Sequence, residues 1–546
     1  MKKKLYGNTT GLRNTQIKKI ETLYSHTTSP EYLSDPELVI RLAELTHEIR
    51  RQIGLLIDRN GKTIYVILGD PHRIVIPVTD GYMATPGQLK GLRLFHTHLK
   101  NEPLTRDDLT DLALLRLDFI TAVCVTQQGR PGAIYSGHIS ADENSAPYHV
   151  LEPGTVKDLD TDCLARILAL ESELSKKNSL YKPETGSENA FLINAAISHP
   201  QTAYASIEEL KELCKTSHIN VIGTALQQRK NIDSKFVVGK GKLSDIIIKA
   251  IQKYATMLVF DRELSASQIR SITDFAEIKV IDRTQLILDI FAKQAKSKEG
   301  KYQVELAQME YLLPRLISKN TAMSRLTGGI GGRGPGETKL EINRRRVREK
   351  ITRLKKEITK IRKQRRMQKS RRKRRDLPVI SIVGYTNAGK STLLNTLTQS
   401  RIIAADRLFA TLDPSSRRLR FPRETEVIIT DTVGFIKNLP KELMEAFHAT
   451  LEDLADADIL LHVIDISNPR YQQQKESVER ILKKLNLHTI PVVYVYNKID
   501  KIHLESFDDQ WLLKQGIPVC ATRKKTLAPL VEKLESMVDK SALFHY

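Results

Sequence analysis

The chain has 546 residues, with 86 lysine and arginine residues against 64 aspartate and glutamate residues, so its formal net charge is +22. This length predicts about three or four domains, and the 40% share of hydrophobic residues can fill several cores, which excludes a wholly disordered chain. No apolar run reaches the roughly 18 residues of a membrane span, and the four cysteines form neither a C-x-x-C pair nor a disulfide scaffold, so we expect a cytoplasmic protein.

Residues 1–180 are predicted to form an N-terminal extension with a mixed α/β fold. Apolar runs at 53–57, 63–68, 74–76, 92–95 and 120–125 predict its strands. His96 and His98 stand at the end of the fourth run, and Thr105 and Asp108 precede an apolar helix. This order of H-x-H and T-x-x-D resembles the JAB/MPN metal-binding fold, in which His96, His98 and Asp108 would ligate Zn²⁺.

The same residues have a simpler interpretation. Thr105 and Asp108 also form a helix capping box, and the two histidines can be satisfied surface groups. The interval after His98 is one residue shorter than in the JAB/MPN pattern. The catalytic glutamate of that pattern has no match, because Glu48 is too far from Gly54. Bound zinc therefore stays a hypothesis.

Residues 188–298 are predicted to form a small parallel α/β domain, because strand-like and helix-like runs alternate. The expected strands lie at 190–197, 219–225, 257–260 and 279–281, and the expected helices lie near 207–216, 243–254 and 267–275. The segment from Gly239 to Lys242, Gly-Lys-Gly-Lys, precedes one of these helices. It lacks the full dinucleotide-binding pattern, so we interpret it as an RNA contact or as a plain helix cap.

Residues 299–375 are predicted to form a basic antiparallel helical hairpin. Two apolar stripes have helical spacing; one contains Tyr302, Leu306, Met309, Leu313 and Leu316, and the other contains Val347, Ile351, Leu354, Ile358 and Ile361. Two such stripes joined by a short breaker are best buried against each other.

Most of the net charge lies in the second helix of this hairpin. Residues 339–375 contain 20 lysine and arginine residues and three glutamates, a net charge of +17. Such a block repels itself unless a polyanion neutralises it, and contacts to phosphates release condensed counterions. We therefore expect RNA or DNA as a partner; a solvated helix face or a localisation signal is the simpler alternative.

The expected tip of the hairpin, residues 328–336, reads Gly-Gly-Ile-Gly-Gly-Arg-Gly-Pro-Gly. Its backbone amides are unhindered and can approach a phosphate backbone closely, although the same composition also suits a flexible linker. The predicted RNA contacts are Gly328, Gly329, Gly331, Gly332, Arg333, Gly334, Arg344, Arg345 and Arg346.

Residues 376–546 are predicted to form a nucleotide-binding domain with a C-terminal tail. An apolar strand at 378–383 is followed by the residues from Gly384 to Ser391, Gly-Tyr-Thr-Asn-Ala-Gly-Lys-Ser, and then by a helix. This is the G-x-x-x-x-G-K-[ST] loop in its strand-loop-helix context, in which backbone amides hold phosphates, Lys390 reaches the β and γ oxygens and Ser391 ligates Mg²⁺. Alone, the motif leaves ATP and GTP open.

Two further motifs narrow the choice of nucleotide. Asp431-Thr-Val-Gly434 follows an apolar strand at 427–430, so Asp431 can hold Mg²⁺ and the Gly434 amide can sense the γ-phosphate. Asn497-Lys-Ile-Asp500 follows a strand at 491–496, and Asp500 can accept hydrogen bonds from guanine N1–H and the exocyclic amine. Three motifs in this order, each after a strand, predict a GTPase.

Three positions of the predicted site are less regular. The base loop reads Cys520-Ala521-Thr522, in which only Ala521 matches the expected pattern well. Thr411 is the candidate switch threonine that closes over Mg²⁺, or an ordinary loop threonine. Phe435 stands where many GTPases have a water-positioning glutamine. Because phenylalanine cannot orient water, we expect slow intrinsic hydrolysis that a partner accelerates.

The predicted site comprises three sets of residues. The catalytic residues are Lys390, Thr411 and Gly434, and the Mg²⁺ ligands are Ser391, Thr411 and Asp431. The contacts to GTP or GDP are Gly384, Tyr385, Thr386, Asn387, Ala388, Gly389, Lys390, Ser391, Thr392, Asp431, Thr432, Val433, Gly434, Asn497, Lys498, Asp500, Cys520, Ala521 and Thr522.

These motifs resemble those of the HflX GTPases, within the wider Obg-HflX group. The similarity is carried by residues 384–391, 408–414 and 431–436, the glycine-rich run 326–341, and 237–243, and it covers about 188–546. It implies a multidomain α/β protein in which a P-loop GTPase domain is preceded by an HflX-type α/β domain with a helical hairpin. The N-terminal extension is additional to this pattern.

The resemblance also implies a function. HflX-type proteins bind the large ribosomal subunit and its rRNA near the peptidyl-transferase centre, and split stalled or idle ribosomes, often under stress. The residues themselves predict only a polyanion-binding GTPase, so an RNA-binding switch without splitting activity is the alternative. A metal-dependent peptidase with a regulatory GTPase domain is a third interpretation. We expect a monomer in the cytoplasm, either free or peripheral to a membrane.

Overall fold

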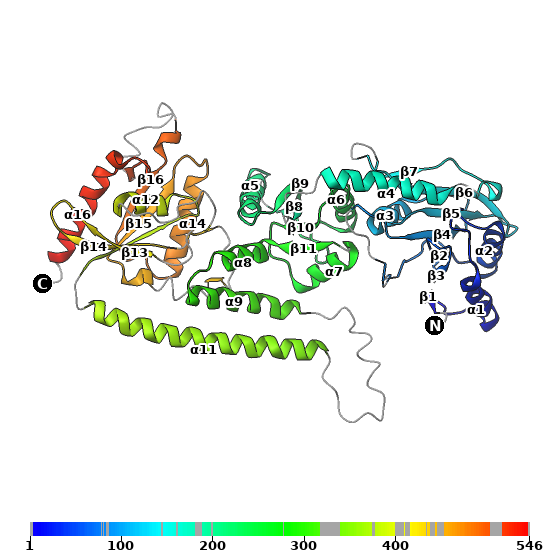
Figure 1. The fold of residues 1–546 in the computed structure, drawn as a ribbon, viewed down its shortest axis with the longest axis horizontal. Helices are drawn as coiled ribbons and strands as arrows, with labels where there is room; N and C mark the ends of the chain where they lie inside the picture. Colours follow the sequence, from blue (N-terminus) through cyan, green and yellow to red (C-terminus); the bar gives the residue numbers. More distant parts are fainter. Residues whose placement is uncertain are drawn as a thin grey trace, which may run out of the picture. The chain divides into compact units, whose positions relative to one another are not determined.

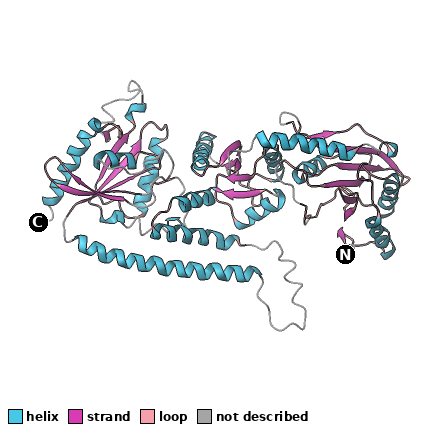
Figure 2. Ribbon diagram, viewed as in Figure 1, coloured by secondary structure: helices cyan, strands magenta, loops and turns pink. Residues whose placement is uncertain are grey.

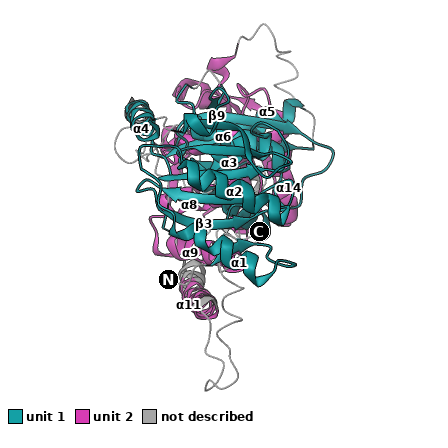
Figure 3. Cartoon of the chain, turned by 90° about the vertical axis from the view of Figure 1, so that its right-hand side faces the viewer, with its two compact units in different colours: residues 1–207, 219–260, 267–280 teal, residues 208–218, 261–266, 281–546 magenta. Residues whose placement is uncertain are grey.

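The computed structural model describes residues 4–77, 79, 81–82, 87–142, 146–159, 162–180, 188–197, 200–276, 278–316, 339–373, 377–398, 409, 415–432, 434–436, 443–444, 453–502 and 516–543. The chain divides into two compact units, which Figure 3 colours separately. The chain contains both helices and β-sheets (Figure 2), so the predicted α/β class is confirmed. Within the described residues, no helix is long and apolar enough to cross a membrane.

The N-terminal region is built on a seven-stranded mixed sheet of order β1-β3-β2-β4-β5-β6-β7. Its strands are β1 (Leu5–Gly7), β2 (Ile53–Asp58), β3 (Thr63–Leu68), β4 (Leu92–His98), β5 (Ile120–Val125), β6 (Pro131–Ile139) and β7 (Tyr148–Val150). Its helices are α1 (Asn14–Glu21), α2 (Pro36–Ile49), α3 (Arg106–Leu115) and α4 (Cys163–Leu180), with short 3-10 helices η1 (Thr22–Ser25) and η2 (Val156–Asp158). Strand β4 lies at the centre of the sheet and is buried along its whole length.

Four of the five strands predicted in this region are confirmed, and the one at 74–76 is wrong. The chain turns at Asp70, whose side chain accepts hydrogen bonds from the backbone amides of His72 at 2.7 Å and Arg73 at 2.9 Å. Ile74 and Ile76 then pack against the core without joining a strand. The side chains of an apolar run can therefore pack against a core while its backbone joins no sheet. The sequence pattern does not distinguish this case from a strand.

Strand β4 presents different side chains to its two faces. The hydroxyl of Thr97 lies 2.8 Å from that of Thr46 on α2, so this side chain points toward α2. Because successive side chains of a strand alternate, His96 and His98 point together to the opposite face. This placement brings the two histidines to the face beside the start of α3.

The middle region contains a four-stranded sheet of order β11-β10-β8-β9. Its strands are β8 (Asn189–Ala196), β9 (Asn220–Gln228), β10 (Met257–Phe260) and β11 (Lys279–Asp282), and its helices are α5 (Pro200–Thr216), α6 (Lys240–Gln252), α7 (Ala266–Ala276) and α8 (Arg283–Gln294). Strand β8 pairs in parallel with both β9 and β10, as predicted. Gly239 caps α6 with a φ of +80°, so the Gly-Lys-Gly-Lys segment begins a helix, and its contact with RNA stays a prediction.

The basic hairpin consists of α9 (Lys298–Leu312), the 3-10 helix η3 (Leu313–Arg315) and α11 (Lys339–Lys373). Figure 1 shows α9 and α11 side by side and running in opposite directions. Their shared core is formed by Leu306, Leu354 and Ile358, with Tyr302, Met309 and Ile351 packed around it. The predicted pairing of the two apolar stripes is confirmed. The predicted glycine-rich tip lies outside the described residues.

The C-terminal domain has a six-stranded sheet of order β13-β14-β12-β15-β16-β17. The strands are β12 (Val379–Gly384), β13 (Ser415–Arg420), β14 (Glu426–Asp431), β15 (Ile459–Asp465), β16 (Val492–Asn497) and β17 (Ile517–Pro518). The helices are α12 (Lys390–Thr398), α14 (Tyr471–Lys484) and α16 (Ala528–Leu543), with 3-10 helices η4 (Asp453–Asp456), η5 (Ile499–Lys501) and η7 (Lys524–Leu527). All pairs are parallel except that of β13 with β14, so β12, β14 and β16 end at one edge of the sheet. Ligands of open α/β sheets bind at this edge.

Candidate functional site

The loop between β12 and α12 requires glycine at both ends. Gly384 has a φ of +152°, and a Cβ atom there would lie 2.3 Å from the carbonyl oxygen of Val463 on the neighbouring strand. Gly389 has a φ of +94°, and a Cβ atom would lie 2.2 Å from Nδ2 of Asn497. The spacing of the two glycines in the motif therefore reflects close approach of β15 and β16 to this loop.

Lys390 begins α12 and lies inside the loop that precedes it. Its Nζ donates hydrogen bonds to the carbonyl oxygens of Gly384 at 3.2 Å and Tyr385 at 2.8 Å, and the residue is only 6% exposed. Burial lowers the pKa of Lys390 to about 8, opposed in part by the charge of Asp431. The ammonium group is thus a desolvated donor at the N-terminus of a helix, where anions are favoured.

The D-x-x-G segment meets this loop at the end of β14. Ser391 Oγ donates a hydrogen bond to Asp431 Oδ2 at 2.7 Å, and Thr432 Oγ1 donates to the carbonyl oxygen of Ile382 at 2.6 Å. A Cβ atom at Gly434 would lie 2.8 Å from Thr386 Cγ2 and 3.1 Å from Lys390 Nζ. The third glycine is therefore also required by close packing against the phosphate-loop motif.

The N-K-x-D segment at the end of β16 joins three loops. Asn497 Nδ2 donates to the carbonyl oxygen of Ala388 at 2.8 Å, and its Oδ1 accepts from the amide of Ala521 at 2.9 Å. Lys498 Nζ donates to the carbonyl oxygen of Asn387 at 2.9 Å and pairs with Asp465 at 2.7 Å. The predicted loops around 384–391, 497–500 and 520–522 therefore lie together.

Asp500 lies beside the base loop on η5. It is exposed, and a hydrogen bond with Cys520 is the largest factor that lowers the pKa of its carboxyl group. The carboxylate is therefore ionised at neutral pH and available to accept hydrogen bonds. Cys520 Sγ also lies 3.1 Å from Thr522 Oγ1, so polar contacts among side chains support the irregular base loop.

Phe435 is 2% exposed and is held by its backbone. Its amide donates to the carbonyl oxygen of Gly384 at 3.1 Å, and its carbonyl accepts from the amide of Thr386 at 2.8 Å. The residue forms an isolated parallel bridge with Tyr385. Its ring is buried and carries no polar group, so it has no means of orienting water.

Two residues outside the predicted motifs contribute to the site. Asp465, which pairs with Lys498, ends the apolar strand β15, and a carboxylate in that position was a signal available in the sequence. Glu209 on α5 accepts a hydrogen bond from the hydroxyl of Tyr385 and pairs with Arg283 at 2.6 Å. Arg283 also pairs with Asp261 at 2.8 Å. No local motif signals this second network, since its members are far apart in the sequence.

Some predicted residues cannot be placed. Thr411, Val433, Gly328, Gly329, Gly331, Gly332, Arg333 and Gly334 lie outside the described residues. Of the other predicted RNA contacts, Arg345 and Arg346 are exposed on α11 and Arg344 is half-buried.

The structure brings together His96, His98 and Asp108 in the N-terminal region, with one potential ligand atom from each within 4.8 Å of the others. Glu48 does not join them; it pairs instead with Lys19 at 3.0 Å on the surface of α1 and α2. The JAB/MPN-type catalytic glutamate therefore has no counterpart at Glu48.

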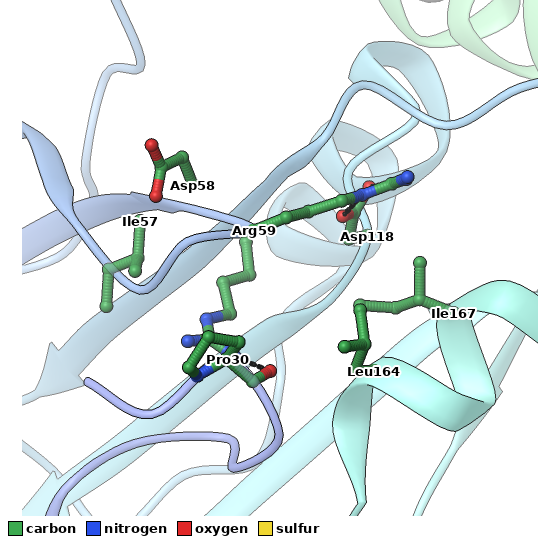
Figure 4. A pocket seen from close by; sticks show the side chains of 8 residues that line it. Pro30, Ile57, Asp58, Arg59, Asp118, Leu164 and Ile167 are labelled. Atoms are coloured by element: carbon green, nitrogen blue, oxygen red, sulfur yellow. Dashed lines mark hydrogen bonds and ion pairs between the residues drawn. The ribbon is translucent and has the colours of Figure 1, made fainter.

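A hollow in the same region has an empty volume of about 190 Å³, including open solvent, and is shown in Figure 4. Its cation Arg59 is already neutralised by Asp118 at 2.7 Å and Glu171 at 2.8 Å. Arg93 donates to the carbonyl oxygen of Tyr32 at 2.5 Å. These charged side chains already have partners within the protein, so we assign no ligand to this hollow.

The chain matches three protein-family models in succession. Residues 204–292 match the N-terminal region of the GTP-binding GTPases, and residues 294–372 match the middle region of the same GTPases. Residues 379–498 match the 50S ribosome-binding GTPase family. All three matches lie beyond the N-terminal extension.

Curated relatives that align with more than half of this chain are named GTPase HflX. GTPase HflX of Caldanaerobacter subterraneus is 45% identical over 364 residues, which cover 66% of this chain and 84% of that protein. GTPase HflX of Escherichia coli is 44% identical over 302 residues, 55% of this chain and 70% of that protein. Among solved structures, a GTP-binding protein from Sulfolobus solfataricus in complex with GDP is 24% identical, with a TM-score of 0.37 over 65% of this chain and 99% of that one. On the strength of the sequence relatives, the chain belongs to the HflX family and is a GTP-binding GTPase.

Proposed function

We propose that this HflX-family GTPase binds the rRNA of the large ribosomal subunit and, when bound to GTP, splits stalled or idle ribosomes into subunits. The observation that carries the proposal is the hairpin, in which α11 buries Leu354 and Ile358 against α9 and leaves its cations outside. The exposed cations include Arg345, Arg346, Arg348, Lys350, Arg353, Lys355, Lys356, Lys360 and Lys363. The match of 379–498 to 50S ribosome-binding GTPases supports a ribosomal partner.

The cationic surface of α11 suits a phosphate backbone better than a protein partner. Glu305 and Glu310 of α9 pair with Lys350 at 2.6 Å and Lys355 at 2.8 Å, which fixes the two helices side by side but leaves most of the positive charge outward. A helix of this charge density gains affinity by releasing counterions from nucleic acid. The proposed contact includes Arg344, Arg345 and Arg346 and the glycine-rich tip with Arg333.

The proposed nucleotide site is the edge of the sheet where β12, β14 and β16 end. Backbone amides of residues 384–392 would hold the phosphates, with Lys390 on the β and γ oxygens. Asp431, Thr432, Val433 and Gly434 would respond to the γ-phosphate, and Thr411 would close over it. Because GTP and GDP differ only in the γ-phosphate, these segments are the proposed route from nucleotide state to ribosome affinity.

The residues present fit a Mg²⁺ ion. Ser391 Oγ and Asp431 Oδ2 are 2.7 Å apart at the mouth of the phosphate loop, and hydroxyl and carboxylate oxygens are the ligands that Mg²⁺ prefers. Ser391, Asp431 and Thr411 would hold the ion. When bound, Mg²⁺ would neutralise charge on the phosphates.

Guanine specificity is assigned to Asp500, with Asn497, Lys498, Cys520, Ala521 and Thr522 shaping the base site. An ionised carboxylate can accept from both guanine N1–H and its amine, whereas adenine offers no such pair of donors. The lowered pKa of Asp500 keeps this acceptor charged.

The splitting activity is tested by mixing the protein and a non-hydrolysable GTP analogue with intact ribosomes and separating the products on a sucrose gradient. We expect a shift from intact ribosomes to free subunits, with GDP in place of the analogue as the control. Co-migration of the protein with intact ribosomes, without subunit release, would instead support an RNA-binding GTPase switch that does not split ribosomes.

A further inference from the structure

The fold gathers three potential metal ligands at the centre of the N-terminal sheet. His96 and His98 are two residues apart on β4 and therefore share one face of the strand. Asp108 lies in the first turn of α3. His96 Nε2 is 3.0 Å from His98 Nε2 and 3.3 Å from Asp108 Oδ1, and His98 Nε2 is 3.4 Å from Asp108 Oδ2.

The three groups are removed from water. His96 and His98 are each 1% exposed, and the side chain of Asp108 is 19% exposed. Buried polar groups of this kind need partners, because an unpaired one loses the hydrogen bonds that it would make in water. A surface role for the two histidines is therefore wrong, since both lie in the core.

The hydrogen bonds around the cluster fix which atoms face inward. His98 Nδ1 lies 3.1 Å from the carbonyl oxygen of Glu102, which can only accept, so Nδ1 carries a proton and Nε2 is the ring nitrogen that faces the cluster. Asp108 Oδ2 accepts hydrogen bonds from the Thr105 amide at 2.8 Å and hydroxyl at 2.7 Å. These hydrogen bonds hold the carboxylate beside the Nε2 atoms of the two histidines.

Three atoms that can each donate an electron pair to a cation converge here. With both rings in the neutral Nδ1–H form, His96 Nε2, His98 Nε2 and the Asp108 carboxylate all present lone pairs to the space between them. A cation between the three atoms would attract all of them. The hydrogen bonds from His98 Nδ1 and to Asp108 Oδ2 then become the orienting contacts that buried metal ligands ordinarily have.

The distances and donor types fit zinc. Ligands bonded to a tetrahedral ion at about 2.0 Å lie about 3.3 Å from one another, close to the three measured separations of 3.0, 3.3 and 3.4 Å. Two imidazole nitrogens and a carboxylate oxygen suit Zn²⁺, whereas Mg²⁺ and Ca²⁺ prefer oxygen ligands only. We propose that His96 Nε2, His98 Nε2 and the Asp108 carboxylate bind one zinc ion that joins β4 to α3 and has its fourth position open to a water.

The capping box formed by Thr105 and Asp108 does not compete with this assignment. Asp108 caps α3 through Oδ2, while Oδ1 points to His96, so one carboxylate can serve both roles. A capping role alone would explain neither the convergence of two buried imidazole rings nor their short Nε2 separation.

The test is the zinc content of the full-length chain, purified without a chelating tag, equilibrated with one equivalent of Zn²⁺ and freed of unbound metal by gel filtration. We expect about one zinc per chain in the wild type and a loss of about tenfold or more in the His96→Ala/His98→Ala and Asp108→Asn variants. His149→Ala is the matched control, because His149 is an exposed histidine on β7 of the same sheet and should leave the zinc content unchanged. GTP hydrolysis by each variant reports separately on the GTPase domain.

A wild-type chain with less than about a tenth of an equivalent of zinc would overturn the assignment, as would ligand variants that keep their zinc. If the ligand variants fail to fold, the wild type loaded with Co²⁺ replaces them. The visible absorption of four-coordinate Co²⁺ supports the site, and the spectrum of free aqueous Co²⁺ contradicts it. These outcomes are independent of ribosome binding.

Discussion

The side-chain oxygen of Asn497 accepts a hydrogen bond from the backbone amide of Ala521 at 2.9 Å. The same side chain donates to the carbonyl oxygen of Ala388 at 2.8 Å, and Asn497 is 2% exposed. One buried amide thus fixes the base loop against the phosphate loop. The geometry of the loop at 520–522 is therefore coupled to that of the loop at 384–391 through a single residue.

Replacing Asn497 with alanine should lower both stability and GTP affinity. The change leaves the Ala521 amide and the Ala388 carbonyl without partners, at a cost of about 1–3 kcal/mol. Urea denaturation and titration with a fluorescent GTP analogue measure the two effects. The control is Gln472→Ala, which removes an exposed amide on α14 and should change neither quantity. Unchanged GTP binding in Asn497→Ala would refute the coupling.

Asp500→Asn should exchange guanine for xanthine as the preferred base. The carboxylate accepts from two donors on guanine, whereas an amide can also donate to the extra carbonyl oxygen of xanthine. We expect GTP affinity to fall by about a hundredfold or more and XTP binding to appear. Competition between GTP and XTP for a labelled nucleotide measures the exchange; a variant that still prefers GTP would show that Asp500 does not contact the base.

GTP affinity should depend on the protonation of Lys390, whose pKa is lowered to about 8 by burial. A phosphate favours the charged ammonium, so affinity should be level below pH 8 and should fall by up to about tenfold per pH unit above it. Lys390→Ala should bind weakly with little change between pH 7 and 9. A wild-type affinity that is constant to pH 9 contradicts the prediction.

The same lowered pKa has a consequence for stability. Between pH 8 and the higher pKa of an unfolded lysine, the unfolded chain binds more protons at this position than the folded chain. The contribution of Lys390 to the free energy of unfolding should therefore rise with pH across this window, and be least favourable below pH 8. Comparing the urea midpoints of the wild type and Lys390→Met at pH 7 and at pH 9 measures how the contribution of Lys390 to the free energy of unfolding changes with pH.

The hydroxyl of Tyr385 links the phosphate loop to Glu209 on α5, so Tyr385→Phe should loosen this contact. Glu209 keeps its pairing with Arg283, so the loss of stability should be modest, about 1 kcal/mol. Hydrogen exchange of the loop at 384–391 should become faster while the sheet is unaffected. Equal exchange in both proteins would show that the hydroxyl does not restrain the loop.

The sequence motifs predicted which loops meet at this edge of the sheet because each motif reflects a local constraint. Gly384 and Gly389 are required by close approach of neighbouring strands, and the apolar strands before Asp431 and Asn497 bring their loops to one edge. Likewise, the spacing of Leu354 and Ile358 predicted that they share a helix face, and both side chains are buried against α9.

The remaining features depend on contacts between distant residues. The pairing of Tyr385 with Glu209, 176 positions away, has no local pattern. The apolar run at 74–76 predicted a strand, yet Ile74 and Ile76 are only partly buried, by packing against the core and not by pairing in a sheet. The burial of His96 and His98 also depends on where β4 lies in its sheet, which the histidine spacing alone cannot show.

The most direct test of the proposed GTP-dependent ribosome binding is the affinity of the protein for isolated large ribosomal subunits with a non-hydrolysable GTP analogue, with GDP, and in the Lys390→Ala variant. We predict tight binding only for the wild type with the analogue, and we expect salt to weaken it because the proposed contact is made through α11 to phosphates. Equal binding in all three conditions would contradict control of ribosome binding by the nucleotide site.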